Sequence, residues 1–319
     1  MLTLFKARSV ITMNDSLPRA SAVLVRDGVV LEVGEEATMA PWLRDQDYVV
    51  DDQFADEIIC PGFIDPHLHP SMAAVLLPME FITAMRWKLP WGEVEPVTTE
   101  AAFDQRMATL VAEKDPQQPL FIWGYHQLWH GAMSKARIES IAGQRPTVVW
   151  HRSFHELYMN SAAMEMVGVV AEDIKPGMQI NVERGHFYEG GLGYAINRLN
   201  PWILAPDKYA AGLQRLKQVV HHGGHTSIGD LATGMFNFSA EAEALSQYLE
   251  GDDVPFRSRL VAHGTVLTKG GVPPTQGPEL AEALLQRNSH RLHFGRHIKL
   301  FSDGAFFSQL AQLQQPGYI

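Results

Sequence analysis

The chain has 319 residues, 46% hydrophobic and 19% charged, which is typical of a globular protein with one large domain or two smaller ones. Asp and Glu total 36 against 26 Lys and Arg, and a net charge of −10 excludes the basic footprint of nucleic-acid or anionic-membrane binding. No apolar run approaches the roughly 20 residues that span a bilayer, and the single Cys60 permits no internal disulfide. We therefore expect a cytoplasmic protein without nucleic-acid or membrane partners, in which Cys60 is buried.

The first 60 residues predict a small β domain of the sandwich type. Asp27 and Gly28 lie between two apolar runs, and this pair is a strong hairpin signal because both turn positions need a positive φ. Strands are expected over residues 2–12, 23–26, 29–33, 49–50 and 58–59.

The region from about residue 80 to 205 reads as a large insertion. An amphipathic helix is expected over 99–114, and buried strands over 119–124 and 147–150. Histidines follow both strands at spacings that match no ligand template. Five aromatic residues suggest a lined cavity, although aromatic runs more often form core: Trp123, Trp129, Trp150, Phe154 and Tyr158.

Strands and helices alternate from residue 206 onward. Helices are expected over 207–222, capped by Asp207, over 239–249, capped by Ser239, and over 278–286. Strands are expected over 226–230, 256–261 and 297–301. With residues 61–65 as the first strand, this order predicts an α/β fold with the first four strands of a (β/α) barrel that needs eight. We expect residues 1–60 to be the N-terminal part of a composite β-sandwich domain, followed by an incomplete TIM-barrel hydrolase domain over 61–319.

The segment 61–69 reads PGFIDPHLH and carries the clearest chemical signal. His67 and His69 are two residues apart, so on a strand their rings point to one face and can bind one metal ion. Asp65 shares that face and can orient a ligand. Fourteen histidines give about 0.6 His-x-His matches by chance, so the setting after an apolar strand gives the motif its weight.

This motif, following a β segment, resembles the opening of the amidohydrolase superfamily. Three later stretches are similar to its large-insert branch, the YtcJ-like proteins and N-substituted formamide deformylases of amidohydrolase family 3. These are residues 155–163 (HELYMNSAA), 224–230 (GHTSIGD) and 298–304 (IKLFSDG). The resemblance extends over essentially the whole chain.

The resemblance implies a metal-dependent hydrolase of non-peptide C–N bonds with one or two divalent ions, most simply zinc. His67, His69 and Lys299 would be metal ligands, with Lys299 carbamylated so that a buried cation becomes an oxygen ligand. The alternative for Lys299 is a side chain that extends from a strand end to solvent. His155, Asp303 and Asp230 would contact an amide-type small-molecule substrate, whereas the alternatives are a packing histidine and two loop aspartates.

The same resemblance places two further histidines and a general-base aspartate after later barrel strands, so the catalytic base is expected outside this chain. We accordingly expect the N-terminal portion of a truncated or longer protein. Two alternatives stay open. One is a non-catalytic fragment or interaction module whose open sheet edges pair with an oligomeric copy or a partner chain. The other is a deaminase of the same superfamily with a single metal and unmodified Lys299.

Overall fold

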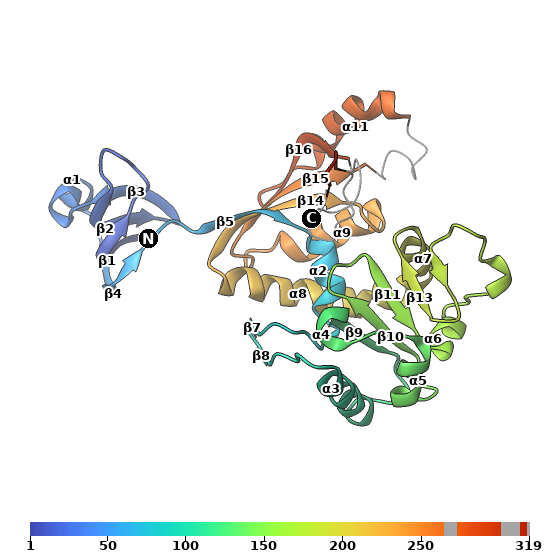
Figure 1. Cartoon of the computed structure of the whole chain (residues 1–319). Helices are drawn as coiled ribbons and strands as arrows, with labels where there is room; N and C mark the ends of the chain where they lie inside the picture. Colours follow the sequence, from blue (N-terminus) through green and yellow to red (C-terminus); the bar gives the residue numbers. More distant parts are fainter. Residues whose placement is uncertain (265–272, 301–312, 318–319) are drawn as a thin grey trace. The chain divides into compact units, whose positions relative to one another are not determined.

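The computed structural model describes residues 1–264, 273–300 and 313–317, and the chain divides into two compact units, Met1–Ile64 and Asp65–Ile319 (Figure 1). The fold is mixed α/β with several sheets, and no sheet closes into a barrel within the described residues. The expected Asp303 lies outside those residues. No helix in the described ranges is both long and apolar enough to cross a membrane.

The first unit is a four-stranded sheet in the order β3-β2-β1-β4. Its strands are β1 (Leu2–Ile11), β2 (Arg19–Arg26), β3 (Val29–Gly34) and β4 (Tyr48–Ile59), with a 3-10 turn over Glu36–Met39 and a short helix α1 (Ala40–Leu43) between the last two. Strand β1 pairs antiparallel with β2 and parallel with β4. Asp27 and Gly28 have φ of 50° and 80°, as the predicted hairpin turn requires.

Residues 1–64 form a single sheet, and the composite β-sandwich of which they would be the N-terminal part stays a prediction. Two other expectations for this unit are wrong. The runs at 49–50 and 58–59 belong to one twelve-residue strand, because β4 is an edge strand whose polar middle faces solvent. Cys60 is exposed, since it follows the exposed end of β4 and is not packed inside an apolar run.

A second four-stranded sheet, in the order β16-β15-β14-β5, belongs to the second unit. Its strands are β5 (Phe63–Leu68), β14 (His225–Thr233), β15 (Arg257–His263) and β16 (Leu292–Lys299), and the last three pair in parallel. The helices α2 (Pro70–Leu76), α8 (Pro206–His222), α9 (Phe238–Leu249) and α11 (Gly277–Leu284) alternate with them, together with 3-10 turns at Pro274–Gln276 and Leu285–Arg287. Parallel strands need such crossovers, which agrees with the alternation in the sequence.

Two predicted helix caps are wrong. Helix α8 begins one residue earlier than expected, at Pro206, and has no side-chain cap, so Asp207 lies in its first turn. Helix α9 begins at Phe238, and its cap is Asn237, whose side chain accepts the backbone N–H of Ala240. Proline fixes φ at the first helical position, so α8 begins at Pro206 and not after Asp207. Asparagine is as good a cap as serine, so Asn237 caps α9 in place of Ser239.

The segment between β5 and β14 forms its own six-stranded sheet, in the order β12-β13-β11-β10-β9-β6. These strands are β6 (Glu80–Phe81), β9 (Leu120–Tyr125), β10 (Thr147–His151), β11 (Glu156–Met159), β12 (Ile180–Asn181) and β13 (His186–Tyr188); β7 (Trp87–Leu89) and β8 (Gly92–Val94) make a separate hairpin. Its helices are α3 (Glu100–Glu113), α4 (Gln127–His130), α5 (Lys135–Ala142), α6 (Ser161–Met166) and α7 (Gly190–Ile203), with a 3-10 turn at Ala171–Asp173. We call residues 80–203 the insertion.

One hydrophobic core joins the insertion to the parallel strands. It contains Trp150 of β10, Leu213 of α8 and Leu260 of β15, all at most 2% exposed. Helices α2 and α8 approach unusually closely, because a Cβ on Gly212 would lie 1.9 Å from the backbone oxygen of Ala74. The buried hydroxyl of Tyr209 also donates to Ser71 Oγ at 2.8 Å. These contacts hold α2, which starts directly after His69, against α8.

Candidate metal and substrate site

His67 and His69 lie at the end of β5 with their rings together. Their Nε2 atoms are 3.3 Å apart, and the ring planes meet at 87°. His67 is exposed and His69 is half-buried as the residue before helix α2. Asp65 Oδ1 accepts the backbone N–H of His67 at 3.0 Å, so it fixes the strand end rather than either ring.

This spacing fits a shared metal ion. Zinc binds histidine nitrogen at about 2.0–2.1 Å, and two nitrogens at a tetrahedral angle on one ion are then about 3.3 Å apart. Partial burial, followed by the neighbouring His69 and the cation of Lys299, lowers the pKa of His67 below its ordinary value. The neutral imidazole that ligation requires is therefore the favoured form.

Asp230 lies behind His69, on β14. Its side chain is 2% exposed, and its Oδ1 is 3.8 Å from His69 Nδ1, which has no hydrogen-bond partner among the described residues. Oδ1 also accepts the N–H of Ala232, and Oδ2 accepts the hydroxyl of Thr233 at 2.6 Å. Close approach of β14 to β5 depends on Gly229, where a Cβ would lie 2.6 Å from the backbone oxygen of Pro66.

Lys299 ends β16 and is half-buried. The positive charge of Lys299 contributes to the lowered pKa of His67, so the two side chains are close enough to interact electrostatically. In the parallel register its partner on β15 is His263, which is only 6% exposed. The carboxyl ends of these strands thus place a lysine and a histidine side by side on the sheet.

The sequence reasoning did not single out His263. Its signal was present, because His263 is the last residue of β15, where barrel enzymes position active-site groups. Within the described ranges, no three His, Cys, Asp or Glu side chains are arranged to hold a metal ion. His67 at the end of β5 and His69 directly after it are a pair of imidazoles without a third such side chain beside them in that part of the structure.

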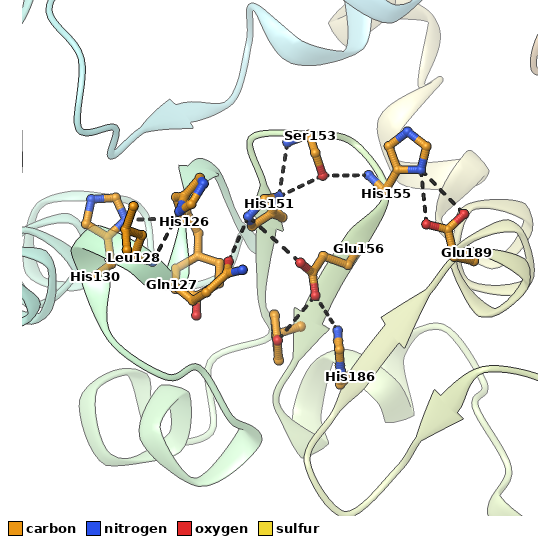
Figure 2. Close-up of polar contacts among 12 residues, drawn as sticks. His126, Gln127, Leu128, His130, His151, Ser153, His155, Glu156, His186 and Glu189 are labelled. Atoms are coloured by element: carbon orange, nitrogen blue, oxygen red, sulfur yellow. Dashed lines mark hydrogen bonds and ion pairs between the residues drawn. The ribbon is translucent and has the colours of Figure 1, made fainter. Parts of the chain in front are cut away.

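His155 occupies the loop between β10 and β11. Its Nδ1 lies 3.2 Å from Glu189 Oε1, and the backbone N–H of Glu189 donates to the His155 oxygen at 2.9 Å (Figure 2). Glu189 and the preceding Phe154 have φ of 46° and 61°, which side-chain-bearing residues rarely adopt. Positive φ at these two positions marks backbone strain on both sides of the contact between His155 and Glu189.

Three further histidines of Figure 2 stabilise turns in their neutral form. In His126, His130 and His151, Nδ1 accepts a backbone N–H, so the remaining proton is on Nε2. His151 also accepts the hydroxyl of Ser153 at 2.7 Å and lies 3.0 Å from Gln127 Oε1. Burial lowers the pKa of His151 to about 4.

Glu156 links this network to β13. Burial acts to raise the pKa of Glu156, but a hydrogen bond from His186 and the nearby charges of His151 and His186 bring it below its ordinary value. The His186 ring stacks on Tyr158 with centroids 4.3 Å apart. An ionised carboxylate is thus held between two imidazoles inside the insertion.

No protein-family model matches the chain. Among curated proteins, it is 25% identical over 262 residues to the exoenzymes regulatory protein AepA of Pectobacterium carotovorum subsp. carotovorum, which covers 78% of this chain and 52% of that protein. It is 23% identical over 311 residues to the Arabidopsis thaliana protein LONG AFTER FAR-RED 3, covering 95% and 50%. The chain spans about half the length of these curated relatives.

Two solved structures superpose on nearly all of the chain. They are crystal structures of uncharacterized metal-dependent hydrolases from Pyrococcus horikoshii OT3 and Pyrococcus furiosus, with TM-scores of 0.68 and 0.65 and identities of 17% and 18%. The chain has the fold of these two hydrolases. The alignment covers 97% of this chain in each case, but 56% and 58% of theirs.

Proposed function

We propose that this chain is part of a metal-dependent hydrolase that cleaves C–N bonds of small, non-peptide amides, in the large-insert branch of the amidohydrolases. The observation that carries the proposal is the 3.3 Å separation of the His67 and His69 Nε2 atoms at the end of β5. The fold shared with two proteins described as metal-dependent hydrolases supports it. We further propose that β5, β14, β15 and β16 are the first four strands of a (β/α) barrel, preceded by part of a β domain.

His67 and His69 would hold a divalent ion, with zinc the simplest choice for two imidazoles, and Lys299 would join them as a carbamate. When bound, such an ion supplies a Lewis acid that polarises a carbonyl and activates water at neutral pH. Residues of this chain would position the side chains of His67, His69 and Lys299. His155 and Asp303 are proposed to contact the substrate.

For Asp230 the geometry favours a different role from the substrate contact expected from the sequence. It is buried, bonded to Ala232 and Thr233, and adjacent to the Nδ1 of His69. A carboxylate in that place orients the imidazole and raises its basicity as a ligand. We therefore propose Asp230 as a positioning residue for His69.

The test is metal content and affinity of the full-length protein, measured by elemental analysis and competition with a chromophoric chelator. His67→Asn and His69→Asn should abolish stoichiometric binding, whereas His290→Asn, a change at an exposed histidine, should not. Asp230→Asn should weaken binding by about 10–100-fold, as loss of an orienting partner does elsewhere. Unchanged metal content in the double variant of His67 and His69 would overturn the proposal. An Asp230→Asn protein with native metal affinity but a raised KM would restore the substrate-contact role.

The remaining expectations stay predictions. A cytoplasmic location rests on the single cysteine. A partner chain or second copy is expected to cover the open edge of the parallel sheet. Strand β4 is a further sheet edge, and it exposes Val49, Val50 and Ile58.

A further inference from the structure

Helix α9 carries a glutamate whose carboxylate is buried. Glu241 is 2% exposed, and burial raises the pKa of its carboxyl, although hydrogen bonds from Ser71 and from three backbone N–H groups act to lower it. A buried carboxylate is costly to desolvate unless hydrogen bonds satisfy its oxygens. The partners of this carboxylate therefore identify the segments of the chain that it stabilises.

Three of these partners are backbone N–H groups of the loop between β14 and α9. The Oε2 atom accepts from Gly234 at 2.9 Å, and Oε1 accepts from Phe236 at 2.6 Å and from Asn237 at 2.8 Å. This loop directly follows Thr233, the last residue of β14, whose hydroxyl donates to Asp230. The carboxylate therefore fixes the end of the strand that carries Asp230.

The fourth partner is the hydroxyl of Ser71, on helix α2. Ser71 is 3% exposed, and its Oγ accepts the hydroxyl of Tyr209, on α8, at 2.8 Å. A serine hydroxyl has one proton to donate, and Ser71 donates it to the carboxylate while its oxygen accepts from the tyrosine. The three side chains thus form a chain of hydrogen bonds from α8 through α2 to α9.

Helix α2 in turn carries His69 at its N-terminus. His69 is the residue before the first helical turn, and its backbone oxygen accepts the N–H of Ala73 at 2.9 Å. Ser71 belongs to that same turn, so a displacement of the turn would move His69 directly. Asp230, whose Oδ1 is 3.8 Å from His69 Nδ1, is held from the other side through the loop after β14. One carboxylate on α9 thus connects both partners of this contact.

The segments that the carboxylate holds also line a cavity of about 260 Å³ in the second unit. Met72 is a lining residue on α2, and Met235 and Phe236 line the cavity from the loop after β14. Trp150 and Phe154, two of the five aromatic residues expected at a cavity, line it from the insertion. Loss of the carboxylate should therefore change the lining of this cavity as well as the start of α2.

We propose that Glu241 is a positioning residue of the metal site, which holds the first turn of α2 and the end of β14 so that His69 lies against Asp230. The inference rests on the proposed binding of metal by His67 and His69, and it adds Glu241 and Ser71 as residues that act through His69. A carboxylate with a purely structural role would stabilise the fold, but its loss would affect metal affinity no more than any equally destabilising change.

The test compares variants of the full-length protein in zinc affinity, measured by chelator competition, and in urea midpoint. Ser71→Ala removes the donor to the carboxylate and leaves its three backbone partners, and Tyr209→Phe removes the hydroxyl that donates to Ser71. Each should weaken zinc binding about fivefold to tenfold, the effect of about one buried hydrogen bond. Glu241→Gln loses the charge and at least one accepted hydrogen bond, and should weaken zinc binding about 10–100-fold.

Tyr125→Phe is the matched control. It also removes a buried hydroxyl, which donates to the Gly131 oxygen at 2.7 Å, but Tyr125 and Tyr209 belong to different hydrophobic clusters. The urea midpoint of Tyr125→Phe should fall about as far as that of Tyr209→Phe, while its zinc affinity stays within about twofold of wild type. Ser71→Ala combined with Glu241→Gln should bind zinc no more weakly than Glu241→Gln alone, because both changes break the same connection.

A second readout needs no metal. In metal-free protein with isotope-labelled histidine, the NMR ring signal of His69 is assigned through its loss in His69→Asn. This signal should shift in Tyr209→Phe and Glu241→Gln and stay in place in Tyr125→Phe. An unchanged signal in both of the first two variants would overturn the inference.

Wild-type zinc affinity in both Ser71→Ala and Glu241→Gln, or an equal loss of affinity in Tyr125→Phe, would also overturn it. Ser71→Ala and Tyr209→Phe keep the test decisive if Glu241→Gln does not fold. A wild-type protein that binds no zinc at His67 and His69 would reject the proposed function instead. The metal-free signal of His69 would then still decide whether the carboxylate positions that ring.

Discussion

Replacing Gly212 with alanine tests how tightly α2 is held against α8. The added Cβ would lie 1.9 Å from the oxygen of Ala74, about 1.5 Å inside ordinary contact, and the obstructing atoms are backbone, which cannot rotate away. The helices must separate, and overpacking of this kind typically costs about 1–3 kcal/mol. Alanine returns up to about 1 kcal/mol of helix propensity, so the net destabilisation should be about 1–2 kcal/mol.

Gly193→Ala is the matched control. It makes the same chemical change inside helix α7, where the new Cβ meets no atom within 4 Å, so the propensity gain should appear alone as about 0.5–1 kcal/mol of stabilisation.

Urea unfolding followed by tryptophan fluorescence measures both, because all seven tryptophans except Trp42 belong to the second unit. Midpoints should shift in opposite directions at similar m-values. If Gly212→Ala is as stable as Gly193→Ala, the close approach of α2 and α8 is wrong. If it is destabilised as expected, metal affinity should also fall, since α2 begins directly after His69.

Two further predictions concern pH and association. The pKa of His151 is about 4 in the folded protein, whereas that of an unfolded histidine is about 6.5. The unfolded chain therefore takes up the proton first as pH falls. The free energy of unfolding should drop by about 1–3 kcal/mol as pH falls from about 6.5 to 4. The lowered pKa of Glu156 acts in the same direction, and His151→Gln should flatten this slope in denaturation series at several pH values; an unchanged slope would exclude His151 as its source. The exposed apolar edge of β4 predicts self-association. Size-exclusion chromatography with light scattering should show a larger mass for the wild type than for a Val50→Lys, Ile58→Lys double variant. A wild-type monomer at about 100 µM would contradict this prediction.

Local chemistry made much of the fold predictable. Asp27 and Gly28 fixed the hairpin because few residues tolerate two successive positive φ angles. Thr99 caps α3 through the N–H of Ala102, as its place before an amphipathic run suggests. The parallel strands were visible as short apolar runs between helices. Errors arose where neighbours compete, as with Asn237 and Ser239, or where an edge strand such as β4 has no need of an apolar middle.

The candidate site was less predictable because it depends on distant residues. The spacing of His67 and His69 predicted both on one strand, whereas β5 ends at Leu68 and His69 directly precedes α2. Only the fold brings Asp230 behind His69. His263 was missed because a single histidine after a strand carries no periodic signal of its own.

A cavity of about 260 Å³ in the second unit is lined mainly by the insertion, whereas His67 lies in β5 and His69 directly follows that strand. Under the proposed function, the metal ligands and the walls of this cavity are therefore encoded by separate stretches of the gene. Substitutions on α7, at Gly193 or Asn200 for example, would change the shape of the cavity and leave the segment with His67 and His69 intact. Related sequences should accordingly vary most on that helix face.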